Sequence, residues 1–296
     1  MNTTAAVIVT YNRKKMLLQC VECIREQTGA AADILVIDNA STDGTREALQ
    51  ESIQAGTLLY FNTGKNIGGA GGFSYGMKKA VELGYTYIWA MDDDTFAERD
   101  ALSTLLAADK KLDGKYGFLS SIAYWTDGSI CNMNRQRTSL REKLTDFSAG
   151  EKPVIMATFV GFWVKTETVR KYGLPIADFF IWSDDLEYSR RISREEKCYA
   201  VTGSRVVHNM ASNAKVGIEQ DSEDRLWRYA YMYRNEVYLY KREGIKGILY
   251  LFLRVILHSV RVLRSSGEGK GIKLKTIWKS FLSGFRFSPV IQYVGE

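Results

Sequence analysis

The chain has 296 residues, of which 46% are apolar and 25% are charged. These proportions are those of an ordinary globular protein and exclude wholesale disorder. The formal net charge of +6 is concentrated at the C-terminus, because residues 222–296 contain 14 Lys and Arg against 6 Asp and Glu. We therefore expect a slightly acidic main domain over residues 1–221 and a basic C-terminal module over 222–296. An acidic main domain argues against nucleic acid as the partner.

The N-terminus and the cysteines bear on where the protein works. The N-terminus lacks a basic segment followed by an apolar signal core, which predicts a cytoplasmic protein. Four cysteines do not make a disulfide framework in a chain of this length. Cys20 and Cys23 have the spacing of a redox or zinc motif, but they lie within a helical pattern and no second Cys/His pair follows nearby. We interpret them as packing thiols.

Short apolar segments rich in β-branched residues alternate with segments of helical periodicity in the first hundred residues. The expected strands are 5–10, 34–38, 57–61 and 85–91, and the expected helices are 14–27, 42–53 and 72–83. Fully apolar strands separated by helices are typical of right-handed βαβ units, in which helices cover both faces of a parallel sheet. The sequence therefore predicts an α/β nucleotide-binding domain with a Rossmann-like, mostly parallel sheet.

Polar residues follow the first, second and fourth of these strands. Thr10, Tyr11 and Arg13 follow the first strand, Asp38 ends the second, and Asp92–Asp94 follow the fourth. Successive parallel strands end at the same edge of a sheet, so these side chains are expected to converge there. Asp38 could accept hydrogen bonds from a uracil or a ribose, and Tyr11 could stack on a base. A turn or helix-cap role is the alternative for each.

The three consecutive aspartates constrain the chemistry most sharply. Adjacent carboxylates repel one another, so a folded chain keeps them where a cation or several hydrogen-bond donors neutralise them. The alternative is a solvated acidic turn that caps a helix starting near Glu98. His208 ends a strand-like run, and a lone histidine is usually structural. Near Asp92–Asp94, however, it would complete an oxygen and nitrogen site suited to Mn²⁺ or Mg²⁺.

Two further segments have the composition of a binding site. Residues 66–76 are rich in glycine but lack the dinucleotide fingerprint, because Ser74 stands where its third glycine is needed. We interpret them as a helix entry whose amide N–H groups can face a diphosphate or a sugar. Phe180 and Trp182 precede Asp184 and Asp185, which open a helix. These carboxylates are either helix caps or include a general base whose pKa is raised by the aromatic surroundings.

The basic C-terminal module is expected to be helical. Residues 221–242 carry many tyrosines, which either pack on the main domain or line an acceptor channel. Residues 245–264 are strongly apolar but are interrupted by Arg254, His258 and Arg261, so a clean membrane-spanning helix is absent. The polar and apolar residues fall on opposite stripes of a helix, which predicts an amphipathic helix on the inner face of the membrane. The alternative is a helix pair packed on the core or forming an oligomer.

Six motifs occur in order along the first 210 residues, and together they resemble family 2 glycosyltransferases of the GT-A fold. They are Val-Thr-Tyr-Asn-Arg at 9–13, Val-Ile-Asp-Asn-Ala-Ser-Thr-Asp-Gly-Thr at 36–45, Asn-Ile-Gly-Gly-Ala-Gly-Gly-Phe at 66–73, Met-Asp-Asp-Asp at 91–94, Trp-Ser-Asp-Asp-Leu-Glu-Tyr-Ser-Arg-Arg at 182–191 and Val-Val-His at 206–208. The set looks most like the bacterial galactofuranosyltransferase and rhamnosyltransferase group. The resemblance implies a GT-A fold and an inverting, metal-dependent transfer of a sugar.

The resemblance also implies roles for individual residues. The donor nucleotide would be bound by Thr10, Tyr11, Arg13, Asp38, Asn66, Gly68, Gly69, Asp92 and Asp93. The divalent ion, Mn²⁺ or Mg²⁺, would be held by Asp92, Asp94 and His208. The base would be Asp185, and the acceptor pocket would be shaped by Trp182 and Asp184. The family usually has Glu-Asp at the base motif, whereas this chain has Asp184-Asp185.

The expected substrates follow from the same resemblance. UDP-galactofuranose is the leading donor, and dTDP-rhamnose or another UDP-hexose is the alternative. The acceptor would be a hydroxyl of a lipid-linked saccharide or an oligosaccharide in surface polysaccharide synthesis. A sugar-nucleotide pyrophosphorylase would need a Gly-x-Gly-Thr-Arg-Leu-like N-terminal loop, which is absent. A non-catalytic polysaccharide-binding module would not explain Asp92–Asp94, Asp185 and His208 together.

Overall fold

The computed structural model describes residues 3–214 and 217–295. These residues form one nine-stranded sheet with the order β3-β2-β1-β4-β8-β6-β9-β5, in which β7 also pairs with β9. The strands are β1 (Thr4–Thr10), β2 (Asp33–Asp38), β3 (Leu59–Asn62), β4 (Tyr87–Asp92), β5 (Thr95–Ala97), β6 (Phe118–Tyr124), β7 (Glu151–Pro153), β8 (Phe162–Lys165) and β9 (Tyr199–His208). The mixed α/β class and the mostly parallel first half agree with the sequence-based prediction.

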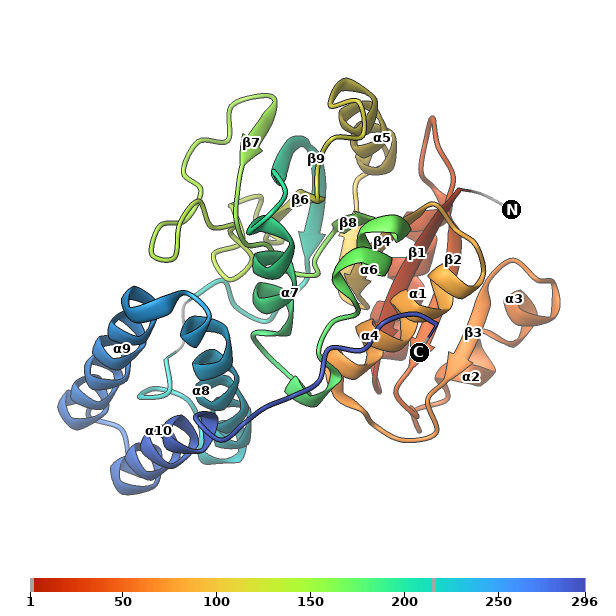
Figure 1. The fold of residues 1–296 in the computed structure, drawn as a ribbon. Helices are drawn as coiled ribbons and strands as arrows, with labels where there is room; N and C mark the ends of the chain where they lie inside the picture. The colour runs from red at the N-terminus through yellow and green to blue at the C-terminus, as the bar shows by residue number, and fades with distance from the viewer. Residues whose placement is uncertain (1–2, 215–216, 296) are drawn as a thin grey trace.

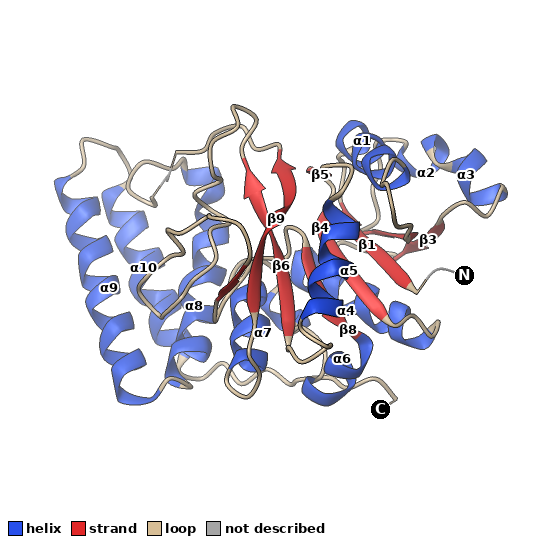
Figure 2. Ribbon diagram, turned by 90° about the horizontal axis from the view of Figure 1, so that it is seen from above, coloured by secondary structure: helices blue, strands red, loops and turns tan. Residues whose placement is uncertain are grey.

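Helices cover both faces of the sheet, as Figures 1 and 2 show. They are α1 (Lys14–Arg25), α2 (Thr45–Ala48), α3 (Gln50–Gln54), α4 (Gly68–Glu82), α5 (Ala101–Lys111), α6 (Thr166–Tyr172), α7 (Asp184–Ser193), α8 (Leu226–Lys241), α9 (Gly244–Arg264) and α10 (Lys270–Gly284). Alternate residues of β1 enter different cores: Val7 packs with α4, whereas Ile8 packs with α1 and α5. A strand buried on both faces explains the apolar run at residues 5–9 of β1.

The register of the parallel strands places their polar C-terminal ends side by side. Thr10 of β1 pairs with Asp38 of β2, and Val9 pairs with Asp92 of β4. The loops that follow β1, β2 and β4 therefore lie at one edge of the sheet, as expected for an open α/β sheet. The short strand β5 then pairs antiparallel with β9, and Thr95 of β5 lies opposite His208 of β9. That pairing brings His208 next to the aspartates although 114 residues separate it from Asp94.

Helix α4 begins at Gly68, four residues before the expected start at residue 72. Its glycines lie inside the helix and allow it to approach the sheet closely. A Cβ on Gly72 would come within 2.5 Å of Val9, and a Cβ on Gly76 within 2.5 Å of Val7. The helix expected over residues 42–53 is two helices in the structure, because α2 ends at Ala48 and α3 begins at Gln50.

The basic C-terminal module consists of α8, α9 and α10, and α8 contacts both of the other helices as well as α7. The tail after α10 then returns across α4 (Figure 1), where the Leu174 amide donates to the Gln292 carbonyl at 2.8 Å. Among the described residues, none of the helices combines the length and the apolarity needed to cross a membrane.

Arg254 and His258 of the polar stripe expected on α9 pack inward, whereas Lys246 and Arg261 of that stripe are exposed. Arg254 forms an ion pair with Glu236 of α8 at 2.7 Å, and His258 Nδ1 lies 2.7 Å from the Tyr233 hydroxyl. The outward face of α9 is instead apolar, and its exposed large side chains are Ile245, Leu249, Phe252, Leu253, Ile256, Leu257 and Leu263. A helix that directs an arginine inward and its leucines outward departs from the usual pattern of a soluble surface helix.

Candidate active site

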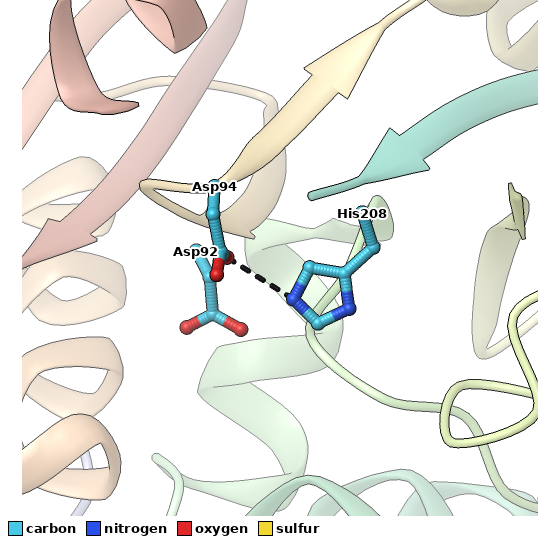
Figure 3. Close-up of side chains that lie close together, drawn as sticks. All are labelled: Asp92, Asp94 and His208. Atoms are coloured by element: carbon cyan, nitrogen blue, oxygen red, sulfur yellow. Dashed lines mark hydrogen bonds and ion pairs between the residues drawn. The ribbon is translucent and has the colours of Figure 1, made fainter. Parts of the chain in front are cut away.

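The aspartates lie at the turn where β4 ends and β5 begins. Asp92 is the last residue of β4, and Asp93 and Asp94 follow it in the turn to Thr95. Figure 3 shows that Asp92, Asp94 and His208 direct their side chains toward one point. One ligand atom from each of these residues lies within 4.8 Å of the others. The structure thus brings together the three residues predicted to hold a divalent ion.

A second residue orients the imidazole of His208. Its Nε2 lies 3.0 Å from Asp94 Oδ1, and its Nδ1 lies 2.8 Å from Asn134 Oδ1. An amide oxygen only accepts hydrogen bonds, so Nδ1 carries a proton; Nε2 faces the aspartates and, when protonated, donates to Asp94. Burial would lower the pKa of His208, but the hydrogen bond and charge of Asp94 outweigh burial and raise the pKa to about 10. Sequence reasoning missed Asn134, which lies in an irregular stretch without a recognisable motif.

Thr10 at the end of β1 and Arg13 just after it stabilise part of the aspartate charge. Thr10 Oγ1 donates to Asp93 Oδ2 at 2.7 Å, and Arg13 Nη1 lies 3.4 Å from Asp93 Oδ1 and pairs more closely with Asp94. The sequence predicted that Thr10 and Arg13 bind the donor nucleotide. In the structure both already contact the carboxylates, so they link the first loop to the possible metal ligands.

The three carboxyl groups differ in their ionisation. Burial raises the pKa of Asp92 to about 7, with a further rise from the charge of Asp94, and burial raises the pKa of Asp93 to about 6. The pKa of Asp94 is lowered, because its contacts with His208 and Arg13 outweigh burial. Of the three carboxyl groups, Asp92 has the highest pKa, because neighbouring positive groups offset its burial least. A bound cation would stabilise its charged form.

The other predicted donor-binding residues surround the same edge. Tyr11 is 45% exposed and therefore available for stacking. Asp38 is fully buried and accepts hydrogen bonds from the Ser41 amide and the Tyr60 hydroxyl, which is the turn role that the sequence left open. Asn66 Oδ1 accepts from the Gly68 amide at 2.9 Å at the entry to α4, where Gly69 follows.

The predicted base lies at the N-terminus of α7. Asp184 is buried and Asp185 is half-buried, and the Asp185 side chain accepts a hydrogen bond from the Leu186 amide at 2.7 Å. Burial raises the pKa of Asp185 to about 6. Burial and the charges of Asp185 and Asp92 raise the pKa of Asp184 well above its usual value. The charge of Asp92 therefore acts on Asp184, the first residue of α7.

Trp182 precedes this carboxyl pair and packs on the C-terminal module. Its ring meets that of Tyr229 of α8 edge to face, with ring centres 5.1 Å apart. The residue predicted to shape the acceptor pocket is therefore held by the module that follows the α/β part of the chain.

Comparisons of the sequence with known proteins point to one family of enzymes. The family model described as glycosyl transferase family 2 matches residues 5–167. The chain is 27% identical over 269 residues to galactofuranosyltransferase GlfT1 of Mycolicibacterium smegmatis, covering 82% of this chain and 85% of that protein. It is also 27% identical to the GlfT1 of Mycobacterium tuberculosis, over 82% of this chain and 84% of the relative.

Solved structures share the fold at low sequence identity. S. aureus TarS (residues 1–349) superposes with a TM-score of 0.56 at 13% identity, over 97% of this chain and 73% of that one. GalNAc-T7, solved with UDP, GalNAc and Mn²⁺, superposes with a TM-score of 0.58 at 20% identity, over 78% of this chain and 48% of that one. The fold is accordingly the GT-A fold. The chain belongs to glycosyl transferase family 2 and is a glycosyltransferase.

Proposed function

We propose that the protein transfers galactofuranose from UDP-galactofuranose, with inversion, onto a hydroxyl of a lipid-linked or oligosaccharide acceptor in surface polysaccharide synthesis. The observation that carries this proposal is the convergence of Asp92, Asp94 and His208 at the sheet edge with a separate carboxyl pair at the start of α7. The choice of sugar is supported by the 27% identity to galactofuranosyltransferases over most of both chains.

A donor screen tests the substrate proposal. The purified protein is incubated with UDP- and dTDP-sugars and a saccharide acceptor, and the release of nucleotide diphosphate is measured with and without Mn²⁺. We expect the fastest release from UDP-galactofuranose in the presence of Mn²⁺. Faster release of nucleotide diphosphate from dTDP-rhamnose would show that dTDP-rhamnose, and not UDP-galactofuranose, is the donor.

The residues of the aspartate cluster fit a divalent ion. Two carboxylates and an imidazole are ligands that suit Mn²⁺ or Mg²⁺, and Asn134 holds the imidazole with its Nε2 toward the carboxylates. Asp92, Asp94 and His208 would hold the ion, and the ion would neutralise charge on the departing nucleotide diphosphate. GalNAc-T7, which has the same fold, was solved with Mn²⁺.

The remaining chemistry falls to the chain itself. Asp185 would take the proton from the acceptor hydroxyl, which would attack the anomeric carbon from the face opposite the leaving group. A separate base is what an inverting displacement requires. Asp93, Thr10 and Tyr11 would orient the donor at the ends of β1 and β4, and Trp182 and Asp184 would position the acceptor.

The rate of transfer is expected to depend on pH through Asp185. A general base acts only when deprotonated, and burial raises the pKa of Asp185 to about 6. We expect kcat/KM to level off above pH 6 and to fall about tenfold per pH unit below it. The measurement is a pH profile of initial rates at constant ionic strength. An acid limb near pH 4, the range of an unperturbed carboxyl, would contradict this assignment.

The C-terminal module would attach the protein peripherally to the inner face of the cell membrane. The outward side chains of α9 are apolar along its length, for example Ile245, Leu249 and Leu253, which are 70%, 55% and 61% exposed. Exposed cations flank this face at Lys246 and Arg264. An apolar strip bordered by cations complements an anionic lipid surface, whereas two copies would bring like charges together.

Vesicle co-sedimentation tests the membrane proposal. Leu253→Glu should weaken partition into anionic vesicles about tenfold or more, since it removes one buried leucine from the lipid contact and adds a negative charge. Met133→Glu is the matched control, because Met133 is also 61% exposed but lies outside the module. A protein that ignores anionic vesicles and dimerises through α9 would show that the face binds a second copy.

A further inference from the structure

The segment before the carboxyl pair has an unusual backbone. Phe180, Trp182 and Ser183 have φ values of 63°, 63° and 70°, in the left-handed region, and none is a glycine. At Phe180 the chain makes a γ-turn of positive φ, in which the Ile181 amide donates to the Phe179 carbonyl at 2.7 Å. Such turns are rare and strained, and they persist only where the surroundings impose them.

One buried side chain of α8 holds this segment. Asn235 Nδ2 lies 3.0 Å from the carbonyl oxygen of Phe179, 3.2 Å from that of Ile181 and 2.9 Å from that of Trp182. Asn235 is fully buried. Its amide has two hydrogens, so one of them is shared between two of the three carbonyl groups.

A neighbouring arginine fixes the direction of the Asn235 amide. Arg234 donates through Nε and Nη2 to Asn235 Oδ1, at 3.0 Å and 2.9 Å. A guanidinium group only donates, so Oδ1 faces Arg234 and Nδ2 must face the strained segment. Arg234 Nη2 also donates to the Asp178 carbonyl at 2.6 Å. The amide is thus held in the one orientation that serves the carbonyl groups.

Helix α4 contacts the same segment from another direction. The Ala70 amide donates to the Phe180 carbonyl at 3.1 Å. A Cβ on Gly68 would lie 2.1 Å from that carbonyl oxygen, so the glycine is required for the segment to approach. The Phe180 ring stacks on Tyr231 of α8 with centres 5.1 Å apart. The strained segment is therefore fixed between the glycine-rich start of α4 and the side chains of α8.

We propose that Asn235 is a positioning residue for sugar transfer. By binding three carbonyl groups of residues 179–182, it secures the left-handed conformation that ends at Ser183, the residue before α7. The next two residues are Asp184 and Asp185, so the conformation of the segment sets where these carboxyl groups lie relative to the aspartate cluster. The consequence for catalysis rests on the proposed function of Asp185, whereas the hold on the backbone does not.

Asn235→Ala is the test variant, and hydrogen exchange and kinetics are its two readouts. We expect amides in peptides covering residues 177–188 to exchange about tenfold faster, because the segment loses its donors. We expect kcat to fall about 10- to 100-fold, since a small displacement of a reacting group costs that much. UDP affinity should stay within about twofold of the wild type, because the hydrogen bonds of Asn235 go to Arg234 and to the carbonyl groups of Phe179, Ile181 and Trp182, none of which is predicted to bind the nucleotide.

A control and a rescue separate positioning from general stability. Val237→Ala removes buried volume from the same helix on the side facing Gly284 of α10, and it should leave both readouts near the wild type. Ser183→Gly relieves the left-handed strain, so adding it to Asn235→Ala should restore part of kcat.

The outcomes distinguish the two hypotheses. Unchanged exchange in Asn235→Ala, an equal loss of kcat in Val237→Ala, or no recovery in the double variant would each overturn the proposed role of Asn235. A wild-type protein that transfers no sugar from any donor would instead refute the proposed function, and the exchange experiment would still decide whether Asn235 holds the segment.

Discussion

Asp185→Asn is expected to lower kcat by about 10²- to 10⁴-fold, the range that a general base contributes. The amide keeps the size of the carboxyl group but cannot accept the proton of the acceptor hydroxyl. UDP binding should persist, because Asp185 is not among the predicted nucleotide-binding residues, which lie at the ends of β1, β2 and β4 and at the entry to α4. The measurements are single-turnover transfer and UDP titration by calorimetry on the same preparation.

Asp184→Asn is the matched control for the base assignment. Asp184 is the buried member of the pair, and Asp92 contributes to the rise in its pKa. If Asp184 shapes the acceptor pocket, its amide variant should raise the KM for the acceptor more than it lowers kcat. Full activity in Asp185→Asn together with an inactive Asp184→Asn would show that the general base is Asp184 and not Asp185.

His208→Ala is expected to weaken Mn²⁺ binding more than the roughly 10- to 100-fold that follows loss of a residue behind a metal ligand. The variant removes one of the three converging ligands and also the partner of Asp94 at 3.0 Å. Transfer activity should fall in parallel and recover in part at high Mn²⁺. Mn²⁺ binding can be followed by electron paramagnetic resonance in the presence of UDP.

Two further variants sharpen the metal experiment. Asn134→Ala should weaken Mn²⁺ binding by about 10- to 100-fold, as expected for a residue that orients a metal ligand. Asp127→Asn is a control, because Asp127 is an exposed turn residue. Unaltered Mn²⁺ affinity in His208→Ala would show that the cluster is not the metal site.

The sequence predicted the parts of the site that come from local patterns. Apolar strands that end in polar residues located Thr10 and Asp92–Asp94, and the parallel order of the strands implied that they meet. These predictions succeeded because the direction of a parallel strand determines the edge at which its C-terminal residues lie. The sequence also suggested His208 as a third ligand, and its pairing opposite Thr95 confirms that it lies beside the cluster.

The residues that support the site were not predictable in the same way. Asn134 reaches His208 across 74 residues, and Asn235 reaches Phe179 across 56. Neither lies in a motif, because their roles depend on contacts between distant segments. The start of α4 was misplaced for a related reason: glycines disfavour a helix locally, but here close packing on β1 requires them. The inward orientation of Arg254 likewise depends on Glu236 of another helix.

The contacts of α8 determine where this polypeptide can be divided and recombined. A cut after residue 221 would separate Asn235 from the segment that its amide holds. Glu243, which follows α8, forms ion pairs at 2.8 Å with Arg190 of α7 and at 2.7 Å with Arg194, the residue after α7. A fragment that keeps the contacts of Asn235 and Glu243 must therefore extend through Glu243, and α9 begins at the next residue. Chimeras that exchange α9 and α10 between relatives should therefore be joined at Gly244, with α7 and α8 inherited from a single parent.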